Sequence, residues 1–340
     1  MESTIESLLA PGKGLLAADE SFPTIGRRFA ALGIPSTEES RLAYREMLFS
    51  TPGLCRFVGG VILFDETLRQ RTGNGPMPEF LAGLDMIPGI KVDKGTIPPP
   101  GFPGEKLTQG LDGLRERLAE YRNLGARFTK WRAVLAVGES APTRACIEDN
   151  ARSLALFAGL SQEAALVPIV EPEVLMDGTH SLETCEAVTT LALEALFASL
   201  ALHRVVLEKI LLKTGMVLSG RDCPGQAGTD TLARATLRCL LRTVPAAVPG
   251  IVFLSGGQPG VAATERLNAI CALGGAPWRV SFSFGRALQD SAMMAWRGDG
   301  ANVKAAQAAL GHRALCNSLA VRGEYSPGAE AGGDATGANA

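Results

Sequence analysis

Histidine is scarce in this chain, and its scarcity limits the chemistry that is open to it. Only three occur among 340 residues, and His180, His203 and His312 lie too far apart to have the spacing of metal ligands. The seven cysteines form no Cys-X-X-Cys pair and no regular pattern, so we interpret them as reduced thiols in a cytosolic protein. The sequence therefore predicts no metal site and no cofactor.

An excess of charge of one sign is also lacking. Lys and Arg number 33 against 35 Asp and Glu, which leaves a net charge of −2 and no indication of a nucleic-acid or membrane-surface partner. The first six residues are acidic and contain no apolar signal core. No run of about 18 uncharged apolar residues appears, so we expect a cytoplasmic protein that spans no membrane.

The chain does contain eight short apolar segments that alternate with helical patterns. The segments are 14–19, 58–64, 87–93, 128–137, 166–174, 209–217, 250–256 and 279–285, with helices at about 37–49, 111–123, 143–160, 182–202, 231–241 and 261–273. Apolar strands with helices between them indicate a parallel sheet covered by helices, and eight such units favour a closed (β/α)8, or TIM, barrel. A doubly wound sheet is the alternative, but no Gly-X-Gly-X-X-Gly follows the first strand.

Other segments complete the expected domain. Ser36 with Glu39 has the spacing of a capping box for helix 37–49, and the proline- and glycine-rich stretch 96–104 is expected to be an irregular loop. Helical sequence after the eighth strand, to about Val321, would close the barrel. We expect one barrel domain over residues 1–325, followed by a short flexible tail at 326–340, which is rich in glycine and alanine.

One lysine in the apolar segment 209–217 carries the functional hypothesis. Lysine is almost never fully buried without a partner or a function, and burial disfavours its ammonium form. A neutral amine attacks carbonyl groups, so Lys213 is a candidate Schiff-base lysine. For this segment alone, a strand-end lysine that reaches solvent is the simpler interpretation.

Polar side chains lie near the ends of seven of the eight predicted strands. In barrels of this class the active site lies at the carboxyl ends of the strands, and residues two apart on a strand share a side. The residues are Asp19, Lys91, Asp93, Lys130, Arg132, Glu171, Glu173, Lys213, Ser255 and Ser283. We expect the cations to raise the positive potential around Lys213, Glu171 to transfer protons, and Asp19 and Glu173 to offset part of the positive charge.

Two groups of residues predict phosphate sites. Ser255-Gly256-Gly257 and Gly285-Arg286 follow the seventh and eighth strands, where barrels of this class hold phosphate. Arg27 and Arg28, after the first strand, could bind a second phosphate through charge-assisted hydrogen bonds. Ordinary turns and an exposed helix end are equally good interpretations of these residues taken singly.

Several motifs together resemble the class I, or Schiff-base, fructose-bisphosphate aldolases. They are APGKGLLAADES (10–21), GGVILFDETL (59–68), GIKVDKG (89–95), TQGLDGL (108–114), VPIVEPE (167–173), LLKTGMV (211–217), FLSGGQ (253–258), SFSFGRALQ (281–289), KAAQ (304–307) and RALCNSLA (313–320). The resemblance extends from Ala10 to Tyr325. It implies a (β/α)8 barrel, a homotetramer, and reversible cleavage of fructose 1,6-bisphosphate to dihydroxyacetone phosphate and glyceraldehyde 3-phosphate in glycolysis and gluconeogenesis.

The resemblance also implies residue roles. Lys213 would form the Schiff base, and Glu171 would be the acid/base in carbinolamine dehydration. Asp19 would take the proton of the C4 hydroxyl, Lys130 would stabilise charge beside Lys213, and Glu173 would complete the catalytic network. The implied substrate-binding residues are Ser21, Thr24, Arg27, Arg28, Lys91, Arg132, Ser255, Gly256, Gly257, Ser283, Gly285 and Arg286.

The sequence departs from the family pattern mainly at its end, which carries no terminal tyrosine. Two alternatives stay open: another sugar-phosphate barrel enzyme, either transaldolase-like or an isomerase, and a barrel kept as a non-catalytic binding protein. The set of Asp19, Lys130, Glu171 and Lys213 argues against both, because a binding protein has no need of it.

Overall fold

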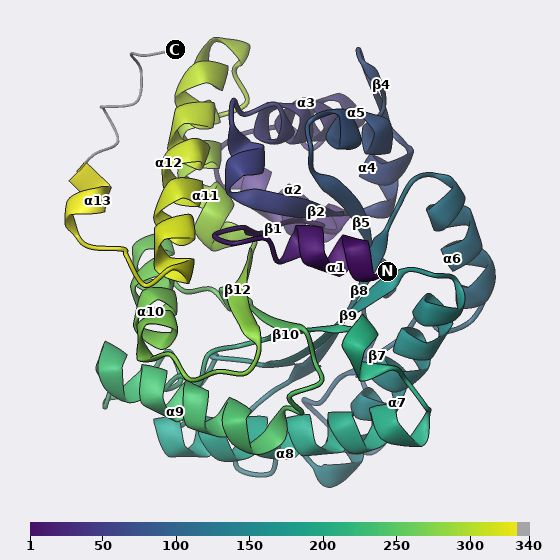
Figure 1. Ribbon diagram of the computed structural model, residues 1–340, viewed down its shortest axis with the longest axis vertical. Coiled ribbons are helices and arrows are strands. Elements are labelled where there is room, and N and C mark those ends of the chain that lie inside the picture. The colour runs from purple at the N-terminus through teal and green to yellow at the C-terminus, as the bar shows by residue number, and fades with distance from the viewer. Residues whose placement is uncertain (332–340) are drawn as a thin grey trace.

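A computed structural model describes residues 1–331, and its centre is a closed parallel barrel (Figure 1). The strands are β1 (Gly14–Ala18), β2 (Val58–Leu63), β5 (Ile87–Lys91), β8 (Phe128–Leu135), β9 (Val167–Val174), β10 (Leu211–Thr214), β11 (Gly250–Phe253) and β12 (Arg279–Phe284). Around the barrel their order is β1-β12-β11-β10-β9-β8-β5-β2, and β2 closes onto β1. The predicted barrel and all eight predicted strands are confirmed.

Helices cover the outside of the barrel. Those at the predicted places are α3 (Glu38–Phe49), α6 (Leu114–Asn123), α7 (Arg144–Glu163), α8 (Leu182–Leu202), α9 (Thr229–Thr243), α10 (Gly260–Leu273) and α12 (Val303–Val321). The others are α1 (Glu2–Leu8), α2 (Phe22–Ala30), α4 (Asp65–Arg69), α5 (Met77–Gly83), α11 (Arg286–Trp296) and α13 (Gly328–Ala331). The sequence patterns above do not predict α2, which carries Pro23 in its first turn, a position that suits proline.

Two local predictions differ from the structure. The capping box of α3 is formed by Thr37 and Ser40 rather than by Ser36 and Glu39: the Thr37 hydroxyl accepts from the Ser40 amide at 3.2 Å, and the Ser40 hydroxyl accepts from the Thr37 amide at 3.0 Å. The stretch expected to be an irregular loop contains a short strand, β6 (Thr96–Ile97), paired with β7 (Leu107–Thr108).

Helix α1 lies across one end of the barrel in Figure 1 and closes it. Its Ile5 and Leu8 belong to one buried cluster with strand residues such as Leu15, Phe128 and Leu211. Glycine is needed at this contact, because a Cβ on Gly59 would lie 2.7 Å from the Ser7 carbonyl oxygen. The amino end of the barrel is therefore filled with apolar side chains, and its carboxyl end is the part left for polar ones.

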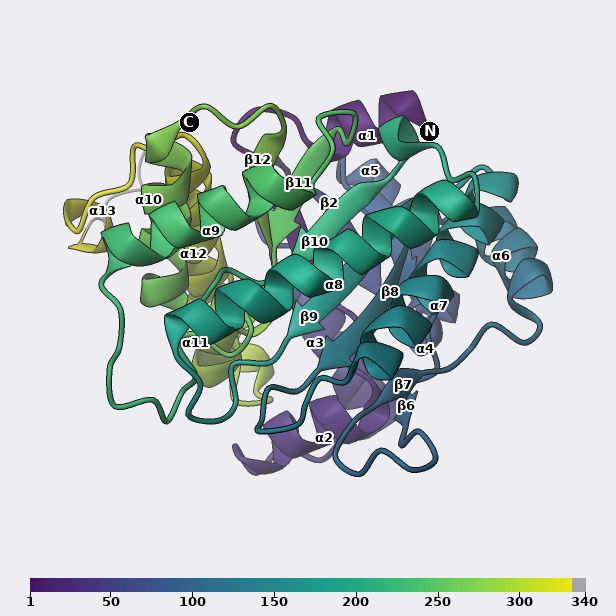
Figure 2. The same ribbon diagram turned by 90° about the horizontal axis from the view of Figure 1, so that it is seen from below.

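Helix α8 is the one described helix that is long and apolar enough to cross a membrane, with a mean hydropathy of 1.6. In this structure it packs beside α7 and α9 on the outside of β9 (Figure 2). Leu193, Leu196 and Leu200 of α8 are fully buried there. A helix of the barrel wall, covered by two neighbours, explains this composition.

The chain after α12 returns to the barrel. Glu330, in α13, accepts two hydrogen bonds from Arg313 of α12, at 2.7 and 2.5 Å, and one from the Tyr325 hydroxyl at 2.6 Å. The first residues of the expected flexible tail therefore contact the wall. The remainder of that tail, 332–340, lies outside the described residues.

Candidate active site

The alternation of side chains along the strands brings the charged residues to one mouth. In β10, Leu211 belongs to the cluster inside the barrel and Leu212 to the cluster outside it. Lys213, two residues after Leu211, therefore points inward. The same spacing relates Ile169 to Glu171 in β9, and comparable pairs in the other strands bring charges to the same end. The sequence argument from residues two apart is thus realised in the fold.

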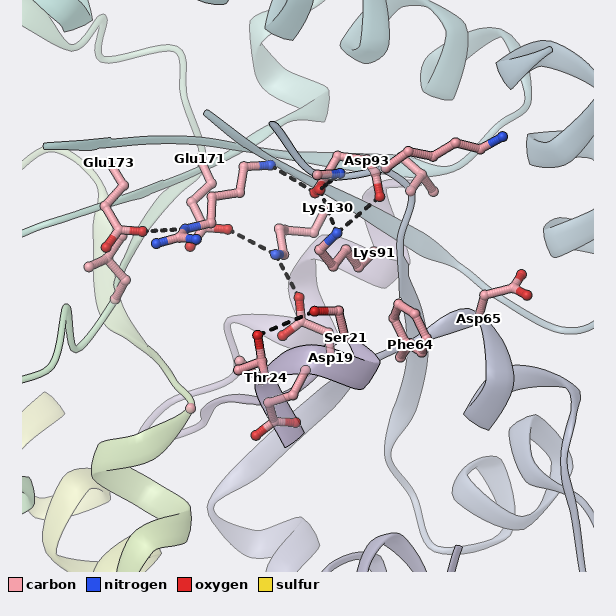
Figure 3. Close-up of a pocket in the computed structure, with 18 of the residues that line it drawn as sticks. Asp19, Ser21, Thr24, Phe64, Asp65, Lys91, Asp93, Lys130, Glu171 and Glu173 are labelled. Carbon is pink, nitrogen blue, oxygen red and sulfur yellow. Dashed lines mark hydrogen bonds and ion pairs between the residues drawn. The ribbon is translucent and has the colours of Figure 1, made fainter. Parts of the chain in front are cut away.

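These side chains surround a cavity of about 1170 Å³ at the carboxyl ends of the strands (Figure 3). Of the predicted site residues, the following line it: Asp19, Ser21, Thr24, Arg27, Arg28, Lys91, Lys130, Arg132, Glu171, Glu173, Lys213, Ser255, Gly256, Ser283, Gly285 and Arg286. Gly257 is not among the lining residues and lies just beyond Gly256. The cavity is large enough for a small phosphorylated substrate.

A continuous chain of ion pairs crosses the floor of the cavity. The Lys213 ammonium lies 3.0 Å from one oxygen of Glu171, and the Lys130 ammonium lies 3.2 Å from the other. Lys130 also contacts Asp19 at 2.6 Å, so it lies between the two carboxylates, as Figure 3 shows. Each of Lys130, Glu171 and Lys213 is only 3% exposed. Three ionisable groups from β8, β9 and β10, together with Asp19 just after β1, thus lie in direct contact with one another.

The pKa values of the buried groups are set by this chain of charges. Burial by itself raises the pKa of Asp19, but the positive charges of Lys130 and Lys213 outweigh it and hold that pKa well below its usual range. Burial also opposes ionisation of Glu171, yet Lys130, Lys213 and Arg132 lower its pKa. Burial by itself lowers the pKa of Lys130, but the negative charges of Asp19 and Glu171 outweigh it and raise that pKa. Both carboxylates are therefore ionised at neutral pH.

Two further cations of the mouth, Lys91 and Arg132, also have carboxylate partners. Lys91 pairs with Asp93, and the Arg132 guanidinium lies 2.5 Å from Glu173. Asp93 in addition accepts the Arg132 backbone N–H at 3.2 Å. The expected positive potential around Lys213 is therefore largely balanced by carboxylates. The sequence predicts this role for Asp19 and Glu173 but assigns no role to Asp93.

One end of the cavity combines glycine backbone, hydroxyl groups and one arginine. After β11, Gly256 and Gly257 have φ of +58° and +90°, which side chains disfavour. The Ser283 hydroxyl is buried and has no hydrogen-bond partner in the described part of the chain. Arg286 begins α11, and none of the ion pairs among residues 1–331 involves it. Donors without acceptors favour an anion here.

The opposite end is formed by α2. Ser21 is the N-cap residue of this helix, and its hydroxyl lies 3.2 Å from that of Thr24. Arg27 and Arg28 lie in the last turn of α2, and both line the cavity. The Arg28 guanidinium is already paired with Glu20 and, at 2.9 Å, with Asp290.

Glu20 was overlooked by the sequence argument, although it follows Asp19 directly. It pairs with Arg28 and, at 2.7 Å, with the buried Arg45 of α3, so it connects the mouth to the wall. Phe22 and Phe64, also overlooked, line the cavity and pack edge to face with ring centroids 5.2 Å apart. The sequence could have indicated Glu20 because it is charged and adjacent to Asp19. It could have indicated Phe22 and Phe64 because they are aromatic residues close to the ends of predicted strands.

A potential metal-binding cluster lies away from the cavity. His312, Cys316 and Glu330 present ligand atoms within 4.8 Å of one another. Both Glu330 oxygens are, however, already bonded to Arg313, and the thiol pKa of Cys316 is raised by burial and by Glu330 to about 11. A thiol and an occupied carboxylate are poor metal ligands. Histidine spacing alone did not reveal this cluster.

Comparison with known proteins identifies the family. Residues 1–339 match the family described as "Fructose-bisphosphate aldolase class-I". The chain belongs to the class I fructose-bisphosphate aldolases. It is 51% identical over 327 residues to a probable class 1 fructose-bisphosphate aldolase of Xanthomonas campestris, covering 96% of this chain and 98% of that one. It is 49% identical over 338 residues to the fructose-bisphosphate aldolase of Dictyostelium discoideum, covering 98% and 94%.

A solved aldolase structure agrees with the fold. The fructose-bisphosphate aldolase of Plasmodium falciparum, solved in complex with TRAP and a small-molecule inhibitor, is 48% identical and superposes with a TM-score of 0.94. The match covers 96% of this chain and 94% of that one. The activity is therefore that of a class I fructose-bisphosphate aldolase, a lyase of glycolysis, and the isomerase, transaldolase and binding-protein alternatives are set aside.

Proposed function

We propose that this aldolase cleaves fructose 1,6-bisphosphate through a Schiff base on Lys213, with Glu171, Lys130 and Asp19 as the groups that move protons and balance charge. The observation that carries the proposal is the chain Asp19–Lys130–Glu171–Lys213, with separations of 2.6, 3.2 and 3.0 Å. It places one buried lysine beside one ionised carboxylate at the floor of the cavity.

The first half of the reaction forms the imine. Glu171, 3.0 Å away, takes one proton from the Lys213 ammonium, the resulting amine adds to the C2 carbonyl carbon, and Glu171 passes that proton to the new alkoxide oxygen. The lowered pKa of Glu171 keeps it ionised and ready for this step. Glu171 then takes a second proton from the carbinolamine nitrogen and gives it to the carbinolamine hydroxyl, which leaves as water. The product is a protonated imine between Lys213 and C2.

The second half breaks the carbon–carbon bond. Asp19, ionised because of Lys130 and Lys213, accepts the proton of the C4 hydroxyl. The C3–C4 electron pair then moves toward the imine nitrogen, so that glyceraldehyde 3-phosphate leaves and an enamine of dihydroxyacetone phosphate remains. Protonation at C3 and hydrolysis by water release the second product and regenerate Lys213. The ammonium of Lys130 holds Asp19 in place and offsets the charge during these transfers.

Two phosphate sites would orient the substrate across this chain. We assign the C1 phosphate to the loops after β11 and β12, with Ser255, Gly256, Gly257, Ser283, Gly285 and Arg286, and the C6 phosphate to Ser21, Thr24, Arg27 and Arg28. Lys91 and Arg132 would contact the sugar, with Glu173 holding Arg132. Arg28 would exchange part of its bonding to Glu20 or Asp290 for the phosphate, whereas Arg27 has no such pair among the described residues.

The assembly and the location are further parts of the proposal. The resemblance to the family supports a homotetramer of the 35.6 kDa chain, and two similar proteins of Arabidopsis thaliana are named cytosolic, which supports a cytoplasmic enzyme. Sedimentation velocity should give a species of four chains. A monomer at micromolar concentration would contradict the tetramer without affecting the chemistry.

Lys213→Arg tests the chemical role, with Lys209→Arg as its matched control. Arginine keeps the positive charge but stays protonated and cannot add to a carbonyl, so Lys213→Arg should abolish cleavage. Lys209 begins the same apolar segment, but its side chain is 35% exposed and its nearest carboxylate is 3.8 Å away. Lys209→Arg should keep the wild-type rate. Substantial cleavage by Lys213→Arg would overturn the assignment.

A further inference from the structure

A second guanidinium lies at the loop after β11, outside the set of residues that the sequence indicates. A Cβ built on Gly257 would lie 3.0 Å from a terminal nitrogen of Arg286 and 3.1 Å from a terminal nitrogen of Arg221. The two guanidinium groups therefore meet on the same side of Gly257, next to the proposed C1-phosphate site. We propose that Arg221 is a specificity-determining residue that binds the C1 phosphate together with Arg286. This inference rests on the proposed function.

The charges around Gly257 support an anion between the two arginines. Arg221 is paired with one carboxylate, Asp177, at 3.5 Å, and both side chains are more than half exposed. Such a pair contributes little and is easily exchanged. Arg286 takes part in none of the ion pairs found among residues 1–331. Two guanidinium groups close together repel each other, and a phosphate dianion can accept hydrogen bonds from both.

The backbone at Arg221 is held where this contact requires it. Three hydrogen bonds connect its loop, after β10, to the loop after β9: Gly220 to the His180 carbonyl at 2.8 Å, Arg221 to Met176 at 2.7 Å, and Asp222 to Gly178 at 2.9 Å. A Cβ on Gly220 would lie 2.3 Å from the Gly178 carbonyl oxygen, so the two loops can approach this closely only with glycine there.

The consequence is a phosphate site built by three loops. Arg221 comes from the loop after β10, Gly257 from the loop after β11, and Arg286 from the start of α11 after β12. Because β10, β11 and β12 are neighbours in the barrel, the loop that follows β10, the strand of Lys213, would also contact the bound phosphate. Arg221 would thus favour substrates with a phosphate on C1, whatever group they carry at C6.

Steady-state kinetics of four variants test the inference: Arg221→Ala, Asp177→Asn, Arg286→Ala and, as a control, Arg238→Ala. Arg238 has a similar exposure of 49% and one carboxylate partner, Glu186, on the outer wall. Arg221→Ala should raise KM for fructose 1,6-bisphosphate and for dihydroxyacetone phosphate in the condensation direction about three- to tenfold, with kcat within about twofold. KM for glyceraldehyde 3-phosphate, which carries the other phosphate, and all constants of Arg238→Ala should be unchanged.

Asp177→Asn separates phosphate binding from a structural ion pair. Without its carboxylate Arg221 is free for the phosphate, so KM for dihydroxyacetone phosphate should stay the same or fall. An equal rise in both Arg221→Ala and Asp177→Asn would mean that the pair is only structural, and would overturn the inference. If Arg286→Ala weakens binding and Arg221→Ala does not, this inference fails and the proposed site stands. If neither variant changes KM, the proposed C1 site fails as well.

Discussion

Replacement of Lys130 by methionine tests the chain of ion pairs most severely. Its ammonium lies 2.6 Å from Asp19 and 3.2 Å from Glu171. With an effective dielectric constant of about 20, each of these contacts corresponds to a Coulomb attraction of about 5–6 kcal/mol before desolvation is counted. Methionine fills a similar volume but removes the charge. Breaking a buried pair in this way costs about 3–5 kcal/mol of folding free energy, because carboxylates stay buried without their partner.

The pH dependence of the Lys130→Met variant has a definite sign. In the wild type, burial raises the pKa of Asp19 and Glu171, and the lysines lower it by more. Without Lys130 the balance moves toward burial and toward repulsion between the two carboxylates, so their pKa values rise and a proton is taken up. The acidic limb of kcat/KM should therefore move to higher pH.

Activity should fall together with this shift. A protonated Asp19 cannot accept the C4 hydroxyl proton, so kcat at pH 7 should drop about 10²–10⁴-fold, which is roughly 3–5 kcal/mol in the barrier. The assay measures kcat and kcat/KM from pH 5 to 9, and urea unfolding measures the free energy of unfolding. Lys209→Met is the surface control, and its free energy of unfolding should lie within about 0.5 kcal/mol of the wild-type value. A Lys130→Met enzyme with kcat within threefold of wild type and an unmoved acidic limb would refute this reasoning.

Four further outcomes are expected. Arg286→Ala should raise KM for fructose 1,6-bisphosphate about 10–100-fold, or about 1.5–3 kcal/mol, and unchanged binding would place the phosphate elsewhere. Dialysis against EDTA should leave the rate unchanged; a loss restored by zinc would contradict the metal-free reaction. Deletion of residues 326–340 should leave the rates of cleavage and of proton exchange on dihydroxyacetone phosphate within about twofold of wild type, a change of under 0.5 kcal/mol in the barrier. A tenfold fall in the exchange rate would contradict this. Burial by itself raises the pKa of Glu330, but hydrogen bonds from Arg313 and the Tyr325 hydroxyl outweigh it and lower that pKa to about 2. Glu330→Gln should therefore lower Tm at pH 7. Calorimetry should find that this difference in Tm disappears as the pH falls from about 4 toward 2.

The barrel was predictable because most of its strands are short runs of mainly apolar residues separated by helical patterns. In β10 the residues Leu211 and Leu212 are both fully buried, one facing the interior and the other a helix, which gives a continuous apolar run in the sequence. Against such a run Lys213 stands out. Spacing by two then groups Glu171 with Glu173, so the composition of the mouth follows from the strands themselves.

The pairing of charges was not predictable in the same way. Asp19 follows β1 and Lys130 lies in β8. These strands are not neighbours in the barrel, so closure of the sheet decides that the two side chains meet. The pairing of Arg28 in α2 with Asp290 in α11 likewise depends on tertiary packing. Sequence patterns report which side of an element a residue occupies. The partner across the cavity depends on tertiary packing.

Reductive trapping tests the central claim most directly. The enzyme is incubated with dihydroxyacetone phosphate, reduced with borohydride, digested and mapped by mass spectrometry. The account predicts one stable adduct per chain, on the peptide that contains Lys213, and none without substrate. An adduct on Lys91 or Lys130 instead, with Lys213 unmodified, would contradict the assignment of the nucleophile.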